Sequence, residues 1–419
     1  MTKIGAARLR PAAEPGIAQL FAQPDFLRLW CVGLVVFVVR WLETLAVALF
    51  VYQATGSAFL VAMMTMLRLL PMGMFGAFLG ALAERMEQRT SLLILVCGSL
   101  ATSATLAVLA HTGALAVWHL AMASFVNGLA WAADNPVRRM MIGQVVGASR
   151  MGQAMSVDVG TNNASRMLGP TLGGVLFATV GIDGAFALGA SLYLVSLLAT
   201  LTLRYRSGVT AAGKDGILAR ISEGLALARR DPRLRGTLVV TIIFNVFGWP
   251  YTALIPVIGR DALQLSPEAI GVLASMDGLG SFCGALAMGL LARPVFYGRC
   301  YLGGVTIYLV ALTLFALAPH PVLAGAALLL NGIGQSGFSI MQATLVYLAA
   351  PPELRSRVLG VLTVCIGLGP VGFLHVGLLA EALSAQIACI VTGLEGLLAL
   401  LLTRRLWRPI LLPPEETAS

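Results

Sequence analysis

Residues 164–174 read ASRMLGPTLGG, and they interrupt a run that is otherwise long, apolar and helix-forming. The arginine places a permanent charge in that run. The Gly-Pro pair favours a bend, because proline frees the carbonyl group four residues earlier. The two final glycines let a neighbouring backbone approach closely. A charge and a bend both weaken an isolated helix, so the stretch predicts a helix in close contact with others, where a buried charge has a use.

The composition of the whole chain indicates the solvent in which that helix lies. The 419 residues are 58% hydrophobic and 11% charged, with a mean hydropathy of +0.87. An average soluble domain has about 25% charged residues, so we expect a membrane protein. A spanning helix needs about 20 mostly apolar residues, and the chain supplies a dozen such segments. They run over 29–53, 59–83, 91–110, 115–135, 154–180, 184–203, 237–259, 267–292, 301–318, 322–349, 358–380 and 385–402.

The basic residues predict how the chain is oriented. All Lys and Arg residues except Arg40, Arg68, Arg166 and Arg260 fall in the terminal arms or in the connections that twelve helices place on one side. By the positive-inside rule that side is cytoplasmic. We therefore expect a multi-pass protein of the cell inner membrane with both termini in the cytoplasm. The net charge of +9 has this origin, and we expect the lipid bilayer, not a nucleic acid, as its partner.

The polar stretch in the middle of the chain separates six predicted helices from six. It contains ILARISEGLALARR, an amphipathic segment of the kind that lies on anionic lipid. The predicted organisation is a cytoplasmic arm, a first bundle, a central loop with this amphipathic helix, a second bundle and a cytoplasmic tail. The predicted bounds of these five parts are 1–28, 29–203, 204–236, 237–403 and 404–419.

The chain lacks the common motifs of soluble catalysis. It has no Walker loop, no HExxH and no GxSxG, and its six cysteines have no CxxC spacing. The connections between the predicted helices are too short to hold a catalytic domain. We therefore expect no enzyme activity, no cofactor and no metal site.

Two landmarks recur in the two halves. Asn127-Gly128 in the fourth predicted helix matches Asn331-Gly332 in the tenth, and Gly169-Pro170 in the fifth matches Gly369-Pro370 in the eleventh. Both recur at nearly the same spacing and in equivalent helices. This pattern indicates two duplicated six-helix units.

A connection between the second and third predicted helices carries a more specific resemblance. GALAERMEQR, residues 80–89, resembles the loop signature of the major facilitator superfamily, although Glu87 and Gln88 depart from it. The resemblance implies an all-α membrane protein with twelve transmembrane helices in two pseudo-symmetric six-helix bundles. In that family the loop latches the cytoplasmic ends of the bundles, and Asp134 is a plausible partner for Arg85 or Arg89. The implied latch residues are Gly80, Glu84, Arg85, Arg89, Asp134 and Arg138.

The opening stretch carries a second resemblance. With Ser156 and Ser165 before it, it is similar to the fifth-helix signature of exporters in this superfamily. FLRLW (26–30), VYQATGSAFLVA (51–62) and DNPVRRMMIGQVV (134–146) resemble the bacterial exporters that include the enterobactin exporter. We expect the small and bent positions to lie in a moving seam between the bundles, or, alternatively, to serve tight packing alone. The predicted hinge residues are Gly169, Pro170, Gly173, Gly174, Gly369 and Pro370.

Several charges fall near mid-depth in the predicted helices. A charge at the bilayer centre costs about 2.5 to 3.5 kcal/mol on insertion scales, so such residues usually face a cavity or a partner. We expect Glu43, and after it Asp277, to bind protons, unless Glu43 pairs with Arg40. We expect Arg166, with Arg68 or Arg40, to hold an anionic part of the cargo, unless it ties its helix to Glu43. The full set of candidates is Arg40, Glu43, Arg68, Arg166, Asp277, Asn245, Asn331 and Gln335.

The sequence therefore predicts a secondary active exporter of small organic molecules, such as a drug, siderophore or metabolite. We expect a monomer that works by alternating access and proton antiport. Ser124 stands where many proton-driven drug exporters of the superfamily carry an arginine, so the chain departs from their pattern at this position. The alternatives are an importer or a lysophospholipid-type lipid transporter of the same fold, or a non-transporting membrane sensor or scaffold.

Overall fold

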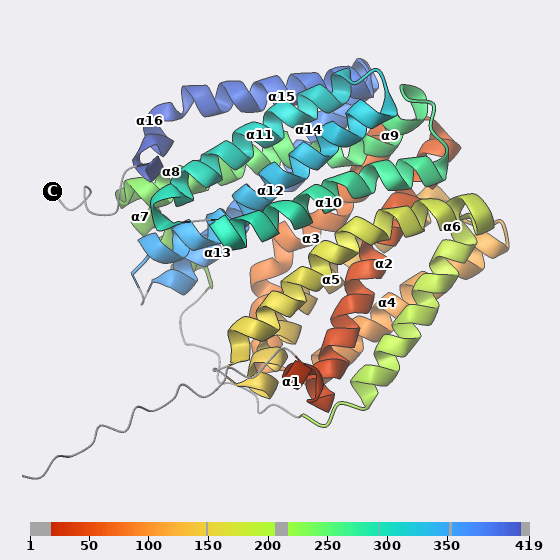
Figure 1. Cartoon of the computed structure of the whole chain (residues 1–419). Coiled ribbons are helices and arrows are strands. Elements are labelled where there is room, and N and C mark those ends of the chain that lie inside the picture. The colour runs from red at the N-terminus through yellow and green to blue at the C-terminus, as the bar shows by residue number, and fades with distance from the viewer. Residues whose placement is uncertain (1–17, 148–149, 206–216, 292, 352–353, 412–419) are drawn as a thin grey trace, which may run out of the picture.

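The computed structural model describes residues 18–147, 150–205, 217–291, 293–351 and 354–411, and these residues are predominantly helical (Figure 1). The first half of the chain forms α1 (Ala18–Phe21), α2 (Pro24–Thr55), α3 (Ala58–Arg85), α4 (Gln88–His111), α5 (Val117–Val146) and α6 (Met151–Leu201). The second half forms α7 (Ile217–Arg230), α8 (Pro232–Ile243), η2 (Phe244–Gly248), η3 (Trp249–Leu254), α9 (Ile255–Asp261), α10 (Pro267–Leu291), η4 (Pro294–Phe296), α11 (Tyr297–Leu317), α12 (Pro321–Ala349), α13 (Arg355–Ile366), α14 (Gly369–Ala382), α15 (Ala385–Leu402), α16 (Arg404–Trp407) and η5 (Arg408–Leu411).

Twelve membrane crossings can be traced in the described residues. Ten helical segments are long and apolar enough to cross a membrane. One of them, α6, contains two crossings, because Gly181 has a left-handed φ of 75° that breaks the helix. The twelfth is α5, which carries Asp134, Arg138 and Arg139 in its second half. The fold class predicted from the sequence is confirmed. The bounds of the arm, bundles, loop and tail stay a prediction, since parts of the arm, loop and tail lie outside the described residues.

The seventh crossing is built from four short helices. The α-helix of α8 ends at Ile243, and the backbone continues through the π-helical η2 and the 3₁₀-helical η3 before α9 begins. Pro250 and Pro256 cannot donate backbone hydrogen bonds, which accounts for the irregular stretch. Trp249, the first residue of η3, lies in this irregular stretch.

The repeated Asn-Gly pairs perform the same packing in each half. Gly128 in α5 lies directly against the carbonyl oxygen of Arg68 in α3, and Gly332 in α12 lies directly against the carbonyl oxygen of Asp277 in α10. In both cases a Cβ atom would overlap that oxygen. The two halves therefore share an internal contact between their second and fourth crossings, as pseudo-symmetric bundles require.

The two bundles converge at the end that carries α9 and diverge toward the end that carries α1 and α16 (Figure 1). At the converging end Tyr52 donates a hydrogen bond to Asp261. The hydroxyl of Ser57 donates to Glu381 at 2.9 Å. Each of these contacts joins a residue of the first half to one of the second. The structure is therefore closed at this end.

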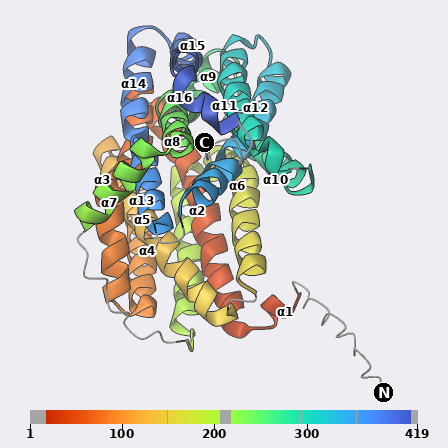
Figure 2. The ribbon, with the colours of Figure 1, turned by 90° about the vertical axis from the view of Figure 1, so that its left-hand side faces the viewer.

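The amphipathic helix predicted in the central loop is α7, whose described side chains begin at Ser222. Gly224 allows α7 to approach α13 closely, since a Cβ there would lie 2.6 Å from the carbonyl oxygen of Arg357. Figure 2 shows the two helices beside each other, and Glu223 forms an ion pair with Arg357. The helix thus packs on the second bundle.

Candidate functional site

A cavity of about 110 Å³ lies where the two bundles meet at mid-depth. Its lining comes from α2, α3, α5 and α6 of the first half and from η3, α9 and α10 of the second. Four of the predicted charged residues, Arg40, Arg68, Arg166 and Asp277, line it. The remaining lining residues are Trp41, Thr44, Leu45, Ala48, Thr65, Leu69, Trp131, Pro170, Trp249, Thr252, Ala253, Ile255, Pro256 and Ala274. The structure therefore brings together residues that lie far apart in the sequence.

Arg166 and Asp277 form an ion pair that joins the bundles across this cavity. Asp277 is 4% exposed. Gly278 lets the two helices meet here, because a Cβ on it would lie 2.5 Å from the carbonyl oxygen of Arg166. The tie between Arg166 and Glu43 that the sequence left open is not the contact that forms. Arg166 is bound to the other bundle instead.

A second polar contact continues the same seam between α6 and α10. The hydroxyl of Ser275 accepts a hydrogen bond from the backbone N–H of Thr171 at 3.1 Å and lies 2.8 Å from its hydroxyl. One turn further, Gly174 lies directly against the carbonyl oxygen of Pro267. The seam thus combines an ion pair, a hydroxyl pair and a close backbone contact along one face of each helix.

Arg68 and Arg40 lie on the first-bundle side of the cavity. Arg68 Nη1 donates to the hydroxyl of Thr44 at 2.6 Å and to the backbone oxygen of Arg40 at 3.4 Å. The guanidinium of Arg40 lies over the ring of Trp131, 4.3 Å from its centroid. Among the described residues no carboxylate lies within ion-pair distance of either guanidinium. Both positive charges are therefore held by hydroxyl, carbonyl and aromatic groups.

Glu43 points away from this cavity into the first bundle. Its Oε1 accepts a hydrogen bond from Ser103 of α4 at 2.7 Å. Gly189 of α6 makes room for the carboxyl group, because a Cβ there would lie 2.6 Å from Oε1. Glu43 is 2% exposed. The pair between Arg40 and Glu43 that the sequence left open does not form, because Arg40 lies over Trp131 and Glu43 is bound to Ser103.

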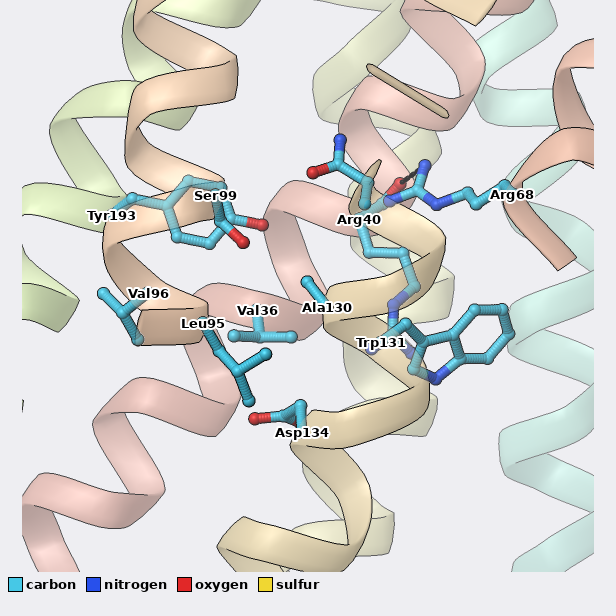
Figure 3. Close-up of a pocket in the computed structure, with 11 residues that line it drawn as sticks. Val36, Arg40, Arg68, Leu95, Val96, Ser99, Ala130, Trp131, Asp134 and Tyr193 are labelled. Carbon is cyan, nitrogen blue, oxygen red and sulfur yellow. Dashed lines mark hydrogen bonds between the residues drawn. The ribbon is translucent and has the colours of Figure 1, made fainter. Parts of the chain in front are cut away.

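Two smaller cavities of about 20 Å³ each lie inside the first bundle. One is lined by Glu43, Arg68 and Asn127, among others, and the second by Arg68, Asn127 and Asp134. Figure 3 shows the second, with Arg40, Arg68 and Trp131 on one side and Ser99 with Tyr193 on the other. A polar cavity of this size has room for a water molecule. Arg68 lines all three cavities, so it separates the central cavity from the interior of the first bundle.

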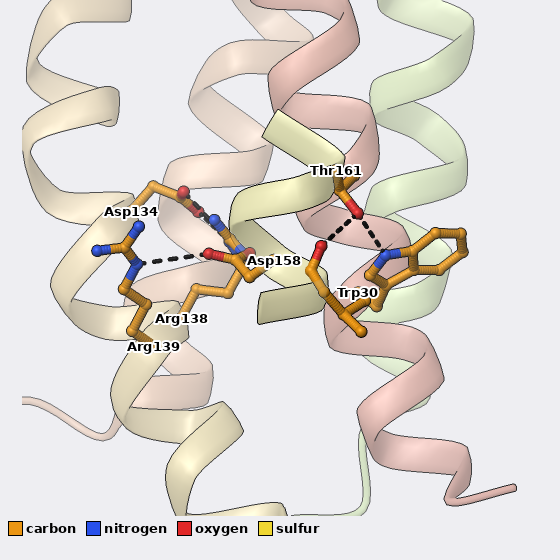
Figure 4. Close-up of polar contacts among 7 residues, drawn as sticks. Trp30, Asp134, Arg138, Arg139, Asp158 and Thr161 are labelled. Atoms are coloured by element: carbon orange, nitrogen blue, oxygen red, sulfur yellow. Dashed lines mark hydrogen bonds and ion pairs between the residues drawn. The ribbon is translucent and has the colours of Figure 1, made fainter. Parts of the chain in front are cut away.

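The predicted latch residues have a different arrangement from the one expected. Asp134 does not pair with Arg89, which donates to the backbone oxygen of Leu201 at 2.7 Å. Asp134 accepts instead from Arg138 at 3.2 Å, and Arg138 also binds Asp158 (Figure 4). The reason is proximity, since Asp134 and Arg138 are one helical turn apart on α5. The side chains of Gly80, Glu84 and Arg85 lie outside the described residues, so a latch between the bundles stays a prediction.

The predicted hinge glycines have two kinds of neighbour. Cβ atoms on Gly169 and Gly173 would lie 2.5 Å from Cβ of Trp41 and 2.6 Å from the carbonyl oxygen of Leu42, both in α2. These glycines therefore serve packing inside the first bundle. Gly174 faces the other bundle. Of the Gly173-Gly174 pair, only Gly174 therefore lies in the contact between α6 and α10.

The remaining predicted hinge residues likewise differ in whether they contact the other bundle or pack inside their own. The carbonyl oxygen of Pro170 would be 2.6 Å from a Cβ on Gly271 of α10, so Pro170 also lies in the seam. Gly369 faces Trp249 within the second bundle, where a Cβ would lie 3.7 Å from its ring. Pro370 follows at the first turn of α14. Whether any of these residues moves is a prediction.

The three predicted amide side chains do not line the central cavity. Asn331 is fully buried, accepts from the hydroxyl of Tyr251 at 2.9 Å and donates to the backbone oxygen of Tyr308 at 3.0 Å. Asn245 of η2 donates to the backbone oxygen of Thr241 of α8, in the same crossing. Gln335 lies further along α12, the helix of Asn331, and α12 contributes nothing to the lining. The prediction used only their depth along the predicted helices, and depth does not determine the direction in which a side chain points.

The sequence reasoning missed three cavity residues with a shared chemistry: Trp41, Trp131 and Trp249. A usable signal was present, since Trp41 directly follows Arg40, Trp41 and Trp249 lie in the middle of predicted spans, and Trp131 lies inside a third. Tryptophan in membrane proteins is more common at the interfaces with water. Three at mid-depth indicate a cavity wall.

The fold and this cavity define the class of protein. Two pseudo-symmetric six-helix bundles that enclose a cavity at mid-depth, lined by charged and aromatic residues, are the architecture of a major facilitator superfamily transporter. Comparison with known proteins agrees: the chain belongs to the transmembrane secretion effector family, which matches residues 17–417. The superfamily membership predicted from GALAERMEQR and the opening stretch is confirmed.

Two relatives and one solved structure support this placement. Macrolide efflux protein A of Streptococcus pyogenes is 20% identical over 380 residues, which span 88% of this chain and 92% of the relative. Enterobactin exporter EntS of Shigella flexneri is 27% identical over 283 residues, 66% of each chain. The crystal structure of a bacterial homolog of the human lysosomal transporter Spinster, inward-facing and unoccupied, covers 96% of this chain at a TM-score of 0.74 and 14% identity, with 100% of that chain covered. This last likeness concerns the fold alone.

Proposed function

We propose that this protein exports small organic molecules across the bacterial cytoplasmic membrane by alternating access. The observation that carries the proposal is the Arg166–Asp277 ion pair, which closes the bundles on each other beside the central cavity. A buried pair between two rigid bodies is costly to leave half-broken. It therefore favours two discrete arrangements of the bundles over a continuum, and alternating access requires discrete arrangements.

The contacts at the converging end indicate which arrangement is present. Tyr52–Asp261 and Ser57–Glu381 close the end opposite to α1 and α16. With the termini in the cytoplasm, as the basic residues predict, the closed end is the outer one. The conformation is then inward-facing, ready to take cargo from the cytoplasm. Export is further favoured by the two relatives, whose names describe an efflux protein and an exporter.

The coupling ion that we propose is the proton, exchanged for cargo, with Glu43 as the carboxyl group that takes it up. Glu43 is the buried acid that is bound by a single hydroxyl and that adjoins a water-sized cavity. Arg68 lines both that cavity and the central one, so a change of charge on Glu43 acts on the cargo site through one shared side chain. One chain supplies the whole cavity, and we propose that a monomer is sufficient and that it has no enzyme activity.

Inverted membrane vesicles test the proposal directly. Vesicles from a strain without its own exporters, with and without this protein, are energised, and the uptake of a panel of dyes, antibiotics and siderophores is measured. Accumulation that depends on the protein and is abolished by a proton ionophore supports proton-coupled export. Uptake only into right-side-out vesicles would establish an importer, and no flux in either orientation would leave the sensor or scaffold alternative.

A further inference from the structure

Four N–H donors without an acceptor belong to residues that line the central cavity. They are Nη2 of Arg40, Nε1 of Trp41, Nε of Arg68 and Nε1 of Trp131, each buried and without a hydrogen-bond partner in the described part of the chain. Among the acceptor atoms of the same described lining residues, only Oδ1 of Asp277 is buried without a hydrogen-bond partner. Buried polar groups are nearly always hydrogen-bonded in folded proteins. A bound molecule rich in acceptors would correct this imbalance.

The charges of the cavity lead to the same class of molecule. Arg166 is neutralised by Asp277, and Glu43 is turned into the first bundle. Arg40 and Arg68 thus remain as two positive charges on adjacent helices, with Arg40 6% exposed. A guanidinium group presents its donors in a planar fork that matches a carboxylate or another planar anion. A cationic cargo is disfavoured, because Asp277, the one acidic residue among the described lining residues, is already paired with Arg166.

The walls around these donors are flat and apolar. The Arg40 guanidinium stacks over Trp131, and that of Arg166 lies 5.4 Å from the ring centroid of Trp41. Trp249, Ile255 and Pro256 line the second-bundle side. Tryptophan rings offer a large contact area to another ring at little entropic cost. The cavity therefore pairs a positively charged, donor-rich side with an aromatic and aliphatic side.

We propose that the cavity binds organic anions that carry an aromatic body, with the anionic group on Arg40 and Arg68 and the body against the tryptophans. This inference rests on the proposed function and names the class of cargo. It also moves the anion site. The arginine first expected to hold the anion, Arg166, joins the bundles, whereas Arg40 and Arg68 hold the cargo.

The test uses three probes with the same body and different charge: 2-naphthoate, 2-naphthamide and 2-naphthylmethylammonium. Their binding to the full chain in lipid nanodiscs is measured by isothermal titration calorimetry. We expect naphthoate to bind at least about tenfold more tightly than the amide, a difference of about 1.4 kcal/mol, and the ammonium compound not to bind measurably. Arg40→Gln and Arg68→Gln should each weaken naphthoate binding about tenfold and leave the weak amide binding unchanged.

Arg405→Gln is the matched control, because Arg405 is an exposed residue of α16 far from the cavity, and it should bind naphthoate like the unchanged protein. If an arginine variant does not fold, the order of the affinities of the three probes for the unchanged protein and for Trp131→Phe still tests the inference. Equal affinities for the three probes, or naphthoate binding that is insensitive to both arginines, would overturn the inference. If naphthoate binds as expected but no vesicle shows flux, the anion site stands and the exporter proposal fails.

Discussion

Arg68 and Asp277 occupy equivalent positions in the two bundles. Each offers its backbone carbonyl oxygen to the glycine of an Asn-Gly pair, Gly128 for Arg68 and Gly332 for Asp277. The backbone is thus repeated, but the side chain that reaches the cavity is basic on one side and acidic on the other. The two bundles therefore share the backbone contact. Because the repeated position is Arg68 in one bundle and Asp277 in the other, it contributes opposite charges to the two sides of the cavity.

Gly128→Ala and Gly332→Ala should both destabilise the protein. A Cβ at either position overlaps a backbone oxygen, which cannot move without shifting a whole helix, and overpacking of this kind costs about 1 to 3 kcal/mol. Thermal unfolding in detergent, followed by loss of native fluorescence, measures the effect. Gly98→Ala is the matched control, because no atom lies within 4 Å of a Cβ there, and it should be neutral or slightly stabilising. Equal behaviour of the three variants would contradict the packing described for the Asn-Gly pairs.

Asp277→Asn should reduce the rate of export by a larger factor than it reduces the amount of folded protein in the membrane. The substitution leaves Arg166 without its partner in the seam, and breaking one side of a buried ion pair costs about 3 to 5 kcal/mol. We expect at least a tenfold loss of vesicle uptake for Asp277→Asn and for Arg166→Gln. The double exchange Arg166→Asp with Asp277→Arg should recover part of it. If the double exchange is no better than the single variants, the pair does not act as a unit.

Glu43→Gln should remove the dependence of export on external pH while cargo binding persists. The reason is that glutamine keeps the hydrogen bond from Ser103 but cannot exchange a proton. The charged and titratable groups that interact with Glu43 are Arg68 of α3 and Tyr193 of α6, and neither of them is altered. Export is measured in vesicles between about pH 6 and pH 8. A pH profile like that of the unchanged protein would exclude Glu43 as the coupling group.

Gly189→Ala tests the same site without changing its charge. A Cβ at this position would push on the carboxyl group of Glu43, since the distance to Oε1 would be 2.6 Å. We expect slower export with a shifted pH profile and little change in naphthoate binding. Gly160→Ala, in the same long helix and with open space around a Cβ, is the control. A shift in both variants would point to a general effect on α6.

The contacts at the converging end should hold the inward-facing state. Tyr52→Phe combined with Glu381→Gln removes a hydroxyl donor from one contact and weakens the acceptor of the other. The cavity should then open more often to the outside. This is measured by replacing the native cysteines, placing one cysteine at Thr252 in the cavity lining, and labelling it from outside with a membrane-impermeant thiol reagent. We expect faster labelling, and Thr112→Ala, which affects only hydrogen bonds to carbonyl oxygens at the end of α4, should label at the original rate.

The crossings and the superfamily could be predicted because their signals are local. Apolar length determines whether a helix can cross the bilayer, and GALAERMEQR and the Gly-Pro stretch are contiguous. The alternative that Asp134 pairs with Arg89 was wrong, because Arg138 lies one turn away on the same helix and binds Asp134, while Arg89 donates to Leu201. The pairing with Arg85 stays a prediction. The amides of Asn245 and Asn331 were assigned to the cavity from depth alone, and depth does not determine on which face of a helix a side chain lies.

By itself the sequence determined the lipid environment, the helical fold, the duplication and the set of charges that had to be accommodated at mid-depth. Each of these follows from the cost of placing a polar group or an unpaired backbone in hydrocarbon. Only the tertiary structure decided which charges meet. Arg166 reaches Asp277 while Glu43 turns toward Ser103, because the glycines in α6, α10 and α5 let particular helix faces touch. Pairing depends on the rotation and separation of helices, and these are properties of packing between segments distant in sequence.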